Sequence, residues 1–74
     1  MKLKDLVSKV IIQGDIRLSV WDEDDDEEIK VTYIKSSDML TVSDISDYKN
    51  LIVKYMFVAQ DNVLHIELVY DRRR

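Results

Sequence analysis

Residues 51–70, with the sequence LIVKYMFVAQDNVLHIELVY, carry the strongest strand pattern of the chain. Two apolar stretches rich in β-branched and aromatic residues, 51–60 and 63–70, flank the pair Asp61-Asn62. Asp and Asn favour tight turns, and apolar stretches of this composition favour strands. The segment therefore predicts a β-hairpin, and the rest of the fold can be worked out from it.

The length of the loop decides which side chains of this hairpin face the core. A change of one residue in register moves every side chain to the other face of the sheet. A loop of two or four residues makes one face wholly apolar, with the pairs Ala59–Leu64, Phe57–Ile66, Tyr55–Leu68 and Val53–Tyr70. A three-residue loop would turn Lys54 and Met56 toward the core. We predict the even loop because it buries no charge.

The first dozen residues have the periodicity of an amphipathic helix. The spacing i, i+3, i+4, i+7, i+8 is followed by Leu3, Leu6, Val7, Val10 and Ile11. The single glycine of the chain, Gly14, follows this run and suits the left-handed residue that ends many helices. We expect a helix over about residues 2–12.

Alternating residues after this helix predict a second hairpin. In the first strand, we expect the core-facing side chains to be Ile16, Leu18 and Val20. The second strand follows the acidic residues 22–28. Its core-facing side chains are expected to be Ile29, Val31 and Tyr33. Its outward side chains are expected to be Lys30, Thr32 and Ile34. Residues 39–42 predict a short edge strand, and Ser43 predicts the N-cap of a short helix.

The order of these elements predicts an α+β fold. An N-terminal amphipathic helix packs on one face of a four- to five-stranded, mainly antiparallel sheet built from two β-hairpins. We expect one domain over residues 1–71 and a disordered basic tail over residues 72–74. The expected core packs Leu18, Val31, Phe57, Ile66 and Leu68 against Leu6 and Val10 of the helix.

Composition limits the function of the chain. Its 15 acidic and 11 basic residues give a net charge of −4, or −7 without the three arginines at 72–74. Such a charge repels nucleic acid and attracts a basic protein surface. Without cysteine there is no disulfide or thiolate metal site, and His65 alone cannot hold zinc. With no signal-like start and no membrane-length apolar run, we expect a cytoplasmic protein without metal or cofactor.

The run of seven acidic residues is the first candidate site: Asp22, Glu23, Asp24, Asp25, Asp26, Glu27 and Glu28. A calcium-binding loop is excluded because Glu27 stands where the turn glycine is needed and Tyr33 where the closing glutamate is needed. Two interpretations remain open. The run is either a solvated hairpin loop, or a patch that imitates closely spaced phosphates and, with the adjacent Trp21, binds a Lys/Arg-rich groove.

The outer face of the expected sheet is the second candidate. It is expected to carry Trp21, Ile34, Met56, Val58, Val63 and Val69, interrupted by Arg17, Lys30, Lys54, His65 and Glu67. Either a loop covers part of this face, or it forms a dimer or partner interface at Ile34, Met56, Val58, His65 and Glu67. The His65-x-Glu67 pair lacks the P-C-x-x-C of zinc deaminases, and we expect no catalytic residues.

Three stretches of the sequence carry a family resemblance. The opening MKLKDLV, the strand DIRLSV followed by an acidic turn, and the closing NVLHIEL resemble small uncharacterised proteins of phages and mobile elements in low-GC Gram-positive bacteria. The resemblance implies a phage-type setting, in which small acidic proteins often block host defence proteins, as many anti-CRISPR proteins do. It assigns no functional residue.

These features fit two different functions. The first is a non-catalytic inhibitor that imitates nucleic acid and binds a basic groove of a host nucleic-acid-handling protein. The second is a small homodimeric structural or accessory protein with an apolar sheet face. The salt dependence of binding distinguishes these two functions, because a charge-driven complex weakens as the ionic strength rises and an apolar dimer does not.

Overall fold

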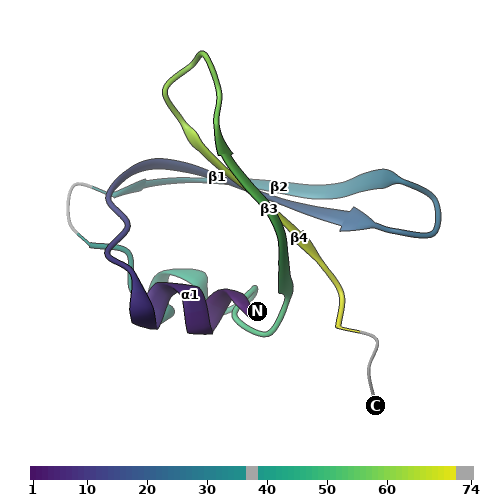
Figure 1. The fold of residues 1–74 in the computed structure, drawn as a ribbon, viewed down its shortest axis with the longest axis horizontal. Helices are drawn as coiled ribbons and strands as arrows, with labels where there is room; N and C mark the ends of the chain where they lie inside the picture. The colour runs from purple at the N-terminus through teal and green to yellow at the C-terminus, as the bar shows by residue number, and fades with distance from the viewer. Residues whose placement is uncertain (37–38, 72–74) are drawn as a thin grey trace.

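The computed structural model of this chain describes residues 1–36 and 39–71. The elements, in chain order, are α1 (Leu3–Lys9), β1 (Gly14–Asp22), β2 (Glu27–Ser36), the 3-10 turn η1 (Val42–Ile45), β3 (Ile52–Val58) and β4 (Leu64–Val69). The four strands form one sheet in the order β2-β1-β4-β3, and α1 lies with η1 across one of its faces (Figure 1). The predicted α+β fold, with its N-terminal helix on a mainly antiparallel sheet, is confirmed.

The two hairpins meet along a parallel pair at the centre of the sheet. β1 pairs with β2, and β3 with β4, in antiparallel fashion, whereas β1 and β4 run parallel. The parallel register sets Leu18 beside Ile66 and Val20 beside Leu68. The first and last strands of the chain therefore form the middle of the sheet.

The core lies between these two central strands and the layer of α1 and η1. Its fully buried apolar side chains are Leu3, Ile16, Leu18, Leu40, Ile45, Ile66 and Leu68. Each such side chain contributes about 1.5–3 kcal/mol relative to an exposed position. Of the core residues predicted above, Leu18, Ile66, Leu68 and Leu6 are buried, and those predictions are confirmed.

The predicted facing of β2 is wrong. Leu18 lies beside Thr32, and Ile16 beside Ile34, so the even-numbered residues of β2 face the core. Ile29, Val31 and Tyr33 are exposed instead, and Ile34 packs against the core rather than on the outer face.

Tyr48, in the turns after η1, explains why polar residues of β2 face inward. Its hydroxyl hydrogen-bonds the Thr32 hydroxyl, and its ring lies 5.4 Å from the Lys30 ammonium. The buried tyrosine thus supplies a hydrogen-bond partner for one of these residues and an aromatic face for the other.

The predicted even loop between β3 and β4 is also wrong. Val58 pairs with Leu64, which leaves the five residues 59–63 in the connection and places Met56 beside Ile66. Phe57 therefore points to the outer face and is exposed. A β-bulge between Val53 and Tyr55 makes Lys54 an extra residue, so the odd loop buries no charge.

The ends of α1 differ from the prediction as well. The helix stops at Lys9, and Val10 is extended and exposed rather than part of the core. Gly14 has a φ of +95°, but it begins β1 and does not cap the helix.

The segment after β2 contains no strand over residues 39–42. Leu40 is buried there, and its N–H donates to the Ile12 carbonyl at 2.8 Å. Thr41, not Ser43, is the N-cap of η1, because Thr41 and Asp44 form a reciprocal capping box. The tail predicted at residues 72–74 lies outside the described residues.

Candidate functional site

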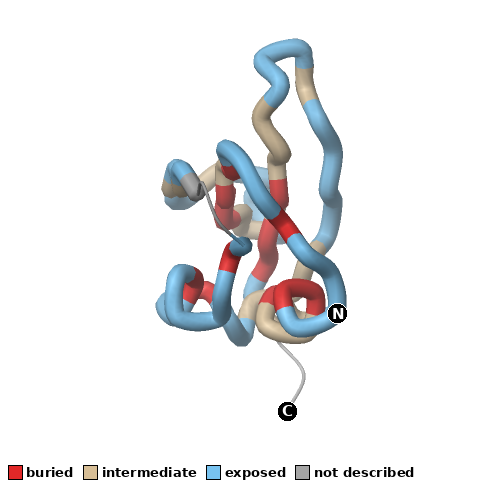
Figure 2. The backbone as a smooth tube through the Cα atoms, turned by 90° about the vertical axis from the view of Figure 1, so that its left-hand side faces the viewer, coloured by how far each residue is buried: buried red, intermediate tan, exposed pale blue. Residues whose placement is uncertain are grey.

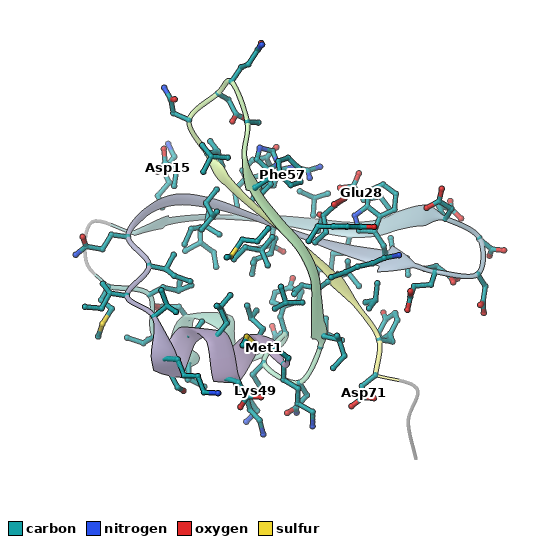
Figure 3. All side chains as sticks on the ribbon, in the orientation of Figure 1. Met1, Asp15, Glu28, Lys49, Phe57 and Asp71 are labelled. Atoms are coloured by element: carbon teal, nitrogen blue, oxygen red, sulfur yellow. The ribbon has the colours of Figure 1, made fainter. Side chains whose placement is uncertain are left out.

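The face of the sheet away from α1 is called the open face here. Its side chains come from alternate positions of all four strands: Arg17, Ser19, Trp21, Glu28, Val31, Tyr33, Tyr55, Phe57, His65 and Glu67. Figure 3 shows Phe57 and Glu28 on the side of the sheet opposite to α1. Aromatic side chains and Arg17 lie together on this face, and aromatic residues and arginine are enriched in interaction surfaces.

Trp21 forms a side-chain hydrogen bond within its own strand. Its indole N–H donates to the hydroxyl of Ser19, two residues earlier, at 3.2 Å. Ser19 is fully buried, and its hydroxyl therefore has a partner inside the protein. Trp21 thus covers a buried polar group while part of its ring remains exposed.

Arg17 joins β1 to β2 across the open face. Its guanidinium is 2.6 Å from a carboxylate oxygen of Glu28, and its Nε donates to the Tyr33 hydroxyl at 3.3 Å. The hydrogen bond with Tyr33, together with the carboxylate of Glu28, raises the pKa of Arg17 above its ordinary value. Glu28 is therefore neutralised within the protein and offers less charge to a partner.

The seven acidic residues do not form one continuous row. Asp22, Glu27 and Glu28 belong to the strands, and a four-residue turn, 23–26, connects them. The Asp22 carboxylate accepts the backbone N–H of Asp24 at 3.0 Å. Asp26 adopts a positive φ of 50°, which aspartate tolerates better than most residues. The acidic residues therefore shape the turn as well as charge it.

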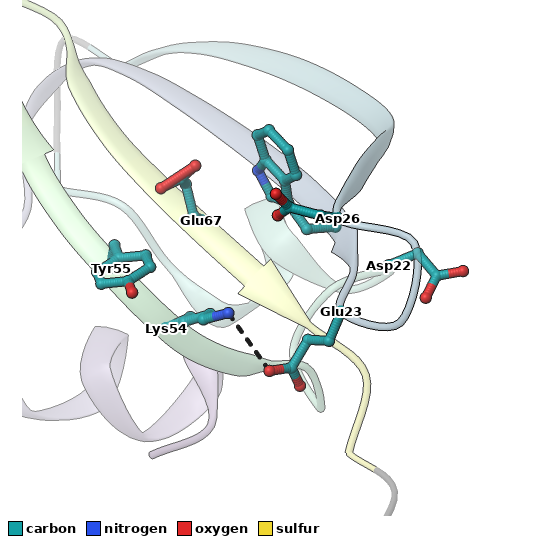
Figure 4. Close-up of a pocket in the computed structure, with 7 residues that line it drawn as sticks. Asp22, Glu23, Asp26, Lys54, Tyr55 and Glu67 are labelled. Carbon is teal, nitrogen blue, oxygen red and sulfur yellow. Dashed lines mark ion pairs between the residues drawn. The ribbon is translucent and has the colours of Figure 1, made fainter.

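A hollow of about 100 Å³ lies between this turn and the open face. Its lining residues are Trp21, Asp22, Glu23, Asp26, Lys54, Tyr55 and Glu67 (Figure 4). The Lys54 ammonium lies 3.4 Å from Glu23 and 5.6 Å from the centre of the Tyr55 ring. Carboxylates and aromatic faces both attract cations, and a cation of the chain itself lies at this hollow.

The structure brings together only some of the predicted site residues. Trp21 and the acidic turn lie together as expected, and Glu67 joins them because β4 runs beside β1. Tyr55 was missed as a site residue, since the predicted parity placed it in the core. The lysine within the apolar run of β3 is the signal that could have shown the bulge, and with it the outward facing of Tyr55.

The remaining residues of the predicted partner face are dispersed. Met56 and Val58 lie on the α1 side of the sheet, where they line a separate apolar groove. His65 lies on the open face and stacks on Phe57, with ring centres 4.9 Å apart and an angle of 9°. Ile34, as described above, packs against the core.

His65 pairs with Asp61 in the turn between β3 and β4. Its Nε2 is 3.2 Å from an Asp61 carboxylate oxygen. The same carboxylate accepts the backbone N–H of Val63, and this bond, helped by His65, lowers the pKa of Asp61. The pair fixes the turn of the β3–β4 hairpin.

Within residues 1–36 and 39–71, no three His, Asp or Glu side chains are grouped to hold a metal ion. In the same residues no helix has the length and apolar character needed to cross a membrane. Comparisons with protein-family models, curated proteins and solved structures found no match.

Proposed function

We propose that this chain is a non-catalytic protein-binding module that receives a basic partner surface at the hollow beside its acidic turn. The observation that carries this proposal is the lining of the hollow. Two aromatic rings, Trp21 and Tyr55, stand beside the carboxylates of the turn and of Glu67. A lysine or arginine side chain of a partner would find ion pairing and an aromatic face in one place.

The charge of the molecule supports the same function. The net charge of −4 attracts a basic partner from a distance, and Asp25, Asp26 and Glu27 are exposed at the tip of the β1–β2 hairpin. Charge of this kind mainly speeds the encounter of two proteins. A partly exposed tryptophan mainly slows their separation once it is desolvated. The turn and the hollow thus act on different steps of binding.

The partner class follows from this chemistry. Closely spaced carboxylates imitate the phosphates of nucleic acid, and proteins that handle nucleic acid carry grooves rich in lysine and arginine. We therefore favour a basic groove of such a protein as the target. The phage-type setting implied by the sequence resemblance would make the chain an inhibitor of a host protein of this class.

The proposal is tested with a fluorescent oligoarginine peptide as the probe. The turn variant carries Asp25→Asn, Asp26→Asn and Glu27→Gln. A matched control carries Asp5→Asn, Asp15→Asn and Asp47→Asn, which change the net charge equally but lie away from the hollow. Fluorescence anisotropy at low and physiological salt measures the affinity.

We expect the turn variant to bind at least about tenfold more weakly than the control variant, a loss of about 1.4 kcal/mol. Its affinity should also depend less on salt than that of the wild type. Tyr55→Ala should weaken binding while the melting temperature stays close to that of the wild type. Equal losses in the turn and control variants would show that only net charge matters, and the proposed site would be wrong.

A further inference from the structure

One edge of the sheet is apolar on both of its faces. In β3, Tyr55 is 58% exposed, Met56 50%, Phe57 46% and Val58 66%. Successive side chains of a strand point to opposite faces, so this edge is uncovered on the open face and on the α1 side alike. Figure 2 shows the strand as the long pale-blue run that descends from the tip of the β3–β4 hairpin.

The N-terminal segment of the chain covers the backbone of this edge only at its start. At its start, Val53 donates its N–H to the Met1 carbonyl at 2.8 Å, and Ile52 forms a bridge with Lys2. At its end, the N–H of Ala59 points the other way, to Val63 of the hairpin. The bulge at Lys54 reverses the directions between these two residues. From Ala59 back to the bulge the directions alternate, so the N–H and C=O groups of Met56 and Val58 point toward the edge.

An apolar groove continues from this edge beneath the sheet. It has a volume of about 380 Å³, and its walls include Val10, Ile11, Met56 and Val58. All four of these side chains are exposed. A strand added to β3 would therefore gain backbone hydrogen bonds along the edge and apolar contacts in the groove.

We propose that β3 pairs with β3 of a second copy of this chain, antiparallel, about a two-fold axis at Phe57. In this register Met56 lies beside Val58 of the partner subunit, and the two residues exchange backbone hydrogen bonds. Phe57 lies beside Phe57 of the partner subunit as a pair without hydrogen bonds. The two sheets join into one sheet of eight strands, and the Met56 and Val58 side chains pack at the groove.

Charge identifies a second copy as the occupant. The strand Ile52–Val58 contains no acidic residue in an otherwise acidic protein. Lys54 lies near one end of it, and Asp61 lies just beyond the other end. Antiparallel pairing brings Lys54 next to the turn that holds Asp61 of the partner subunit. The charges that flank the strand thus complement each other in two copies.

The available area fits a dimer as well. Side chains of this kind, about half exposed, bury on the order of 100 Å² each when they are covered. Apart from Tyr55, which lines the hollow, the apolar residues of the edge and groove in each copy are Val10, Ile11, Met56, Phe57 and Val58. Together the two copies would cover about 1,000 Å², the least area expected of a specific protein–protein interface.

The first test compares a charge placed on each edge of the sheet. Val58→Asp places a carboxylate on β3, and Ile29→Asp places one at an exposed apolar position of β2. Sedimentation equilibrium should give twice the 8.8 kDa chain mass for the wild type and for Ile29→Asp. Val58→Asp should raise the dimer dissociation constant at least about tenfold.

A wild type that stays monomeric up to millimolar concentration would overturn the proposal. So would a Val58→Asp variant that dimerises as strongly as the wild type, or an Ile29→Asp variant that dissociates equally. Val58 does not line the hollow at Trp21. Loss of dimers with unchanged oligoarginine binding would therefore separate this proposal from the proposed function.

The second test fixes the register and does not depend on how Val58→Asp folds. The chain has no native cysteine, so a single introduced cysteine can form a disulfide only with the same cysteine of a second copy. Phe57→Cys would bring two Cα atoms within about 4.5 Å of each other, which suits a disulfide. The matched control is Tyr33→Cys, an exposed aromatic of the open face on the other edge strand.

Under mild oxidation we expect Phe57→Cys to form covalent dimers within minutes, and Tyr33→Cys to form at least about tenfold less in the same time. Similar yields from the two variants would indicate random collision, and the β3–β3 pairing would be wrong.

Discussion

The two edge strands of this sheet are built in opposite ways. β2 carries Glu27, Glu28, Lys30 and Lys35, and its partners Arg17 and Tyr48 hold it from both faces. β3 has a single charge and is apolar on both faces. Charged edges protect a sheet against pairing with other chains, and apolar edges invite it. The difference indicates that the protein blocks one edge and leaves the other available.

The same two strands contain the β-bulges of the sheet. On β2 the register shifts so that Ile29 is the extra residue, and on β3 the extra residue is Lys54. Each bulge reverses the facing of the residues on one side of it. In the central strands β1 and β4 the strict alternation continues along the paired segment from Ile16 to Trp21. Edges tolerate irregular backbone because only one neighbour has to match them.

The largest expected effect tests the contrast between centre and edge. Ile66→Ala, in central β4, removes a fully buried side chain and should cost about 2–5 kcal/mol of unfolding free energy. Phe57→Ala, in the neighbouring edge strand β3, removes an exposed ring that stacks on His65 and should cost less than about 1.5 kcal/mol of unfolding free energy. Urea denaturation of both variants measures the difference. Equal losses would place Phe57 in the core and contradict the register.

A smaller effect tests how β2 is held from the α1 side. Tyr48→Phe removes the hydroxyl that bonds Thr32 and should cost about 1 kcal/mol, because the Thr32 hydroxyl loses its partner. The matched control is Tyr33→Phe, which removes a hydroxyl from an exposed tyrosine bonded to Arg17. It should cost less than about 0.5 kcal/mol. Thermal melting monitored by circular dichroism ranks the two variants, and the reverse order would refute the role given to Tyr48.

The sequence predicts the centre of this fold far better than its edges. The residues Leu18, Ile66 and Leu68 were placed correctly, because β1 and β4 each have one apolar face that admits a single orientation. Val31 and Phe57 were placed wrongly, because the predictions continued a simple alternation through strands that contain bulges. Tyr48 could not be foreseen either, since it reaches β2 from a distant turn.

The candidate site was predictable only where it is local in the chain. Trp21 and the acidic turn are adjacent in sequence, so their proximity follows from any hairpin in this segment. Glu67 and Tyr55 reach the hollow through the parallel pairing of β1 with β4 and through the bulge at Lys54. No local pattern encodes that pairing, because it depends on which hairpin edges meet in the folded sheet.

The smallest expected effect concerns the turn that ends the apolar edge. The backbone N–H of Val63, together with His65, lowers the folded-state pKa of Asp61 below its ordinary value of 3.8. A carboxylate with a lowered pKa adds stability above its unfolded pKa, and this contribution disappears as the pH falls through the folded pKa. We therefore expect wild type to be slightly more stable than Asp61→Asn at pH 6, and the difference to vanish in stronger acid.

Urea denaturation at several pH values, from pH 6 into acid below the ordinary pKa of aspartate, measures this difference. Asp25→Asn, which removes one carboxylate from the turn of the other hairpin, controls for the change in net charge. The amide oxygen introduced by Asp61→Asn can still accept the Val63 N–H, so the variant isolates the charge of Asp61 from the geometry of the turn. A stability difference that grows as the pH falls would show that His65 and Val63 do not favour the ionised carboxylate. The turn would then be held by its backbone alone, and Asp61 would offer no ordered charge at the end of the apolar edge.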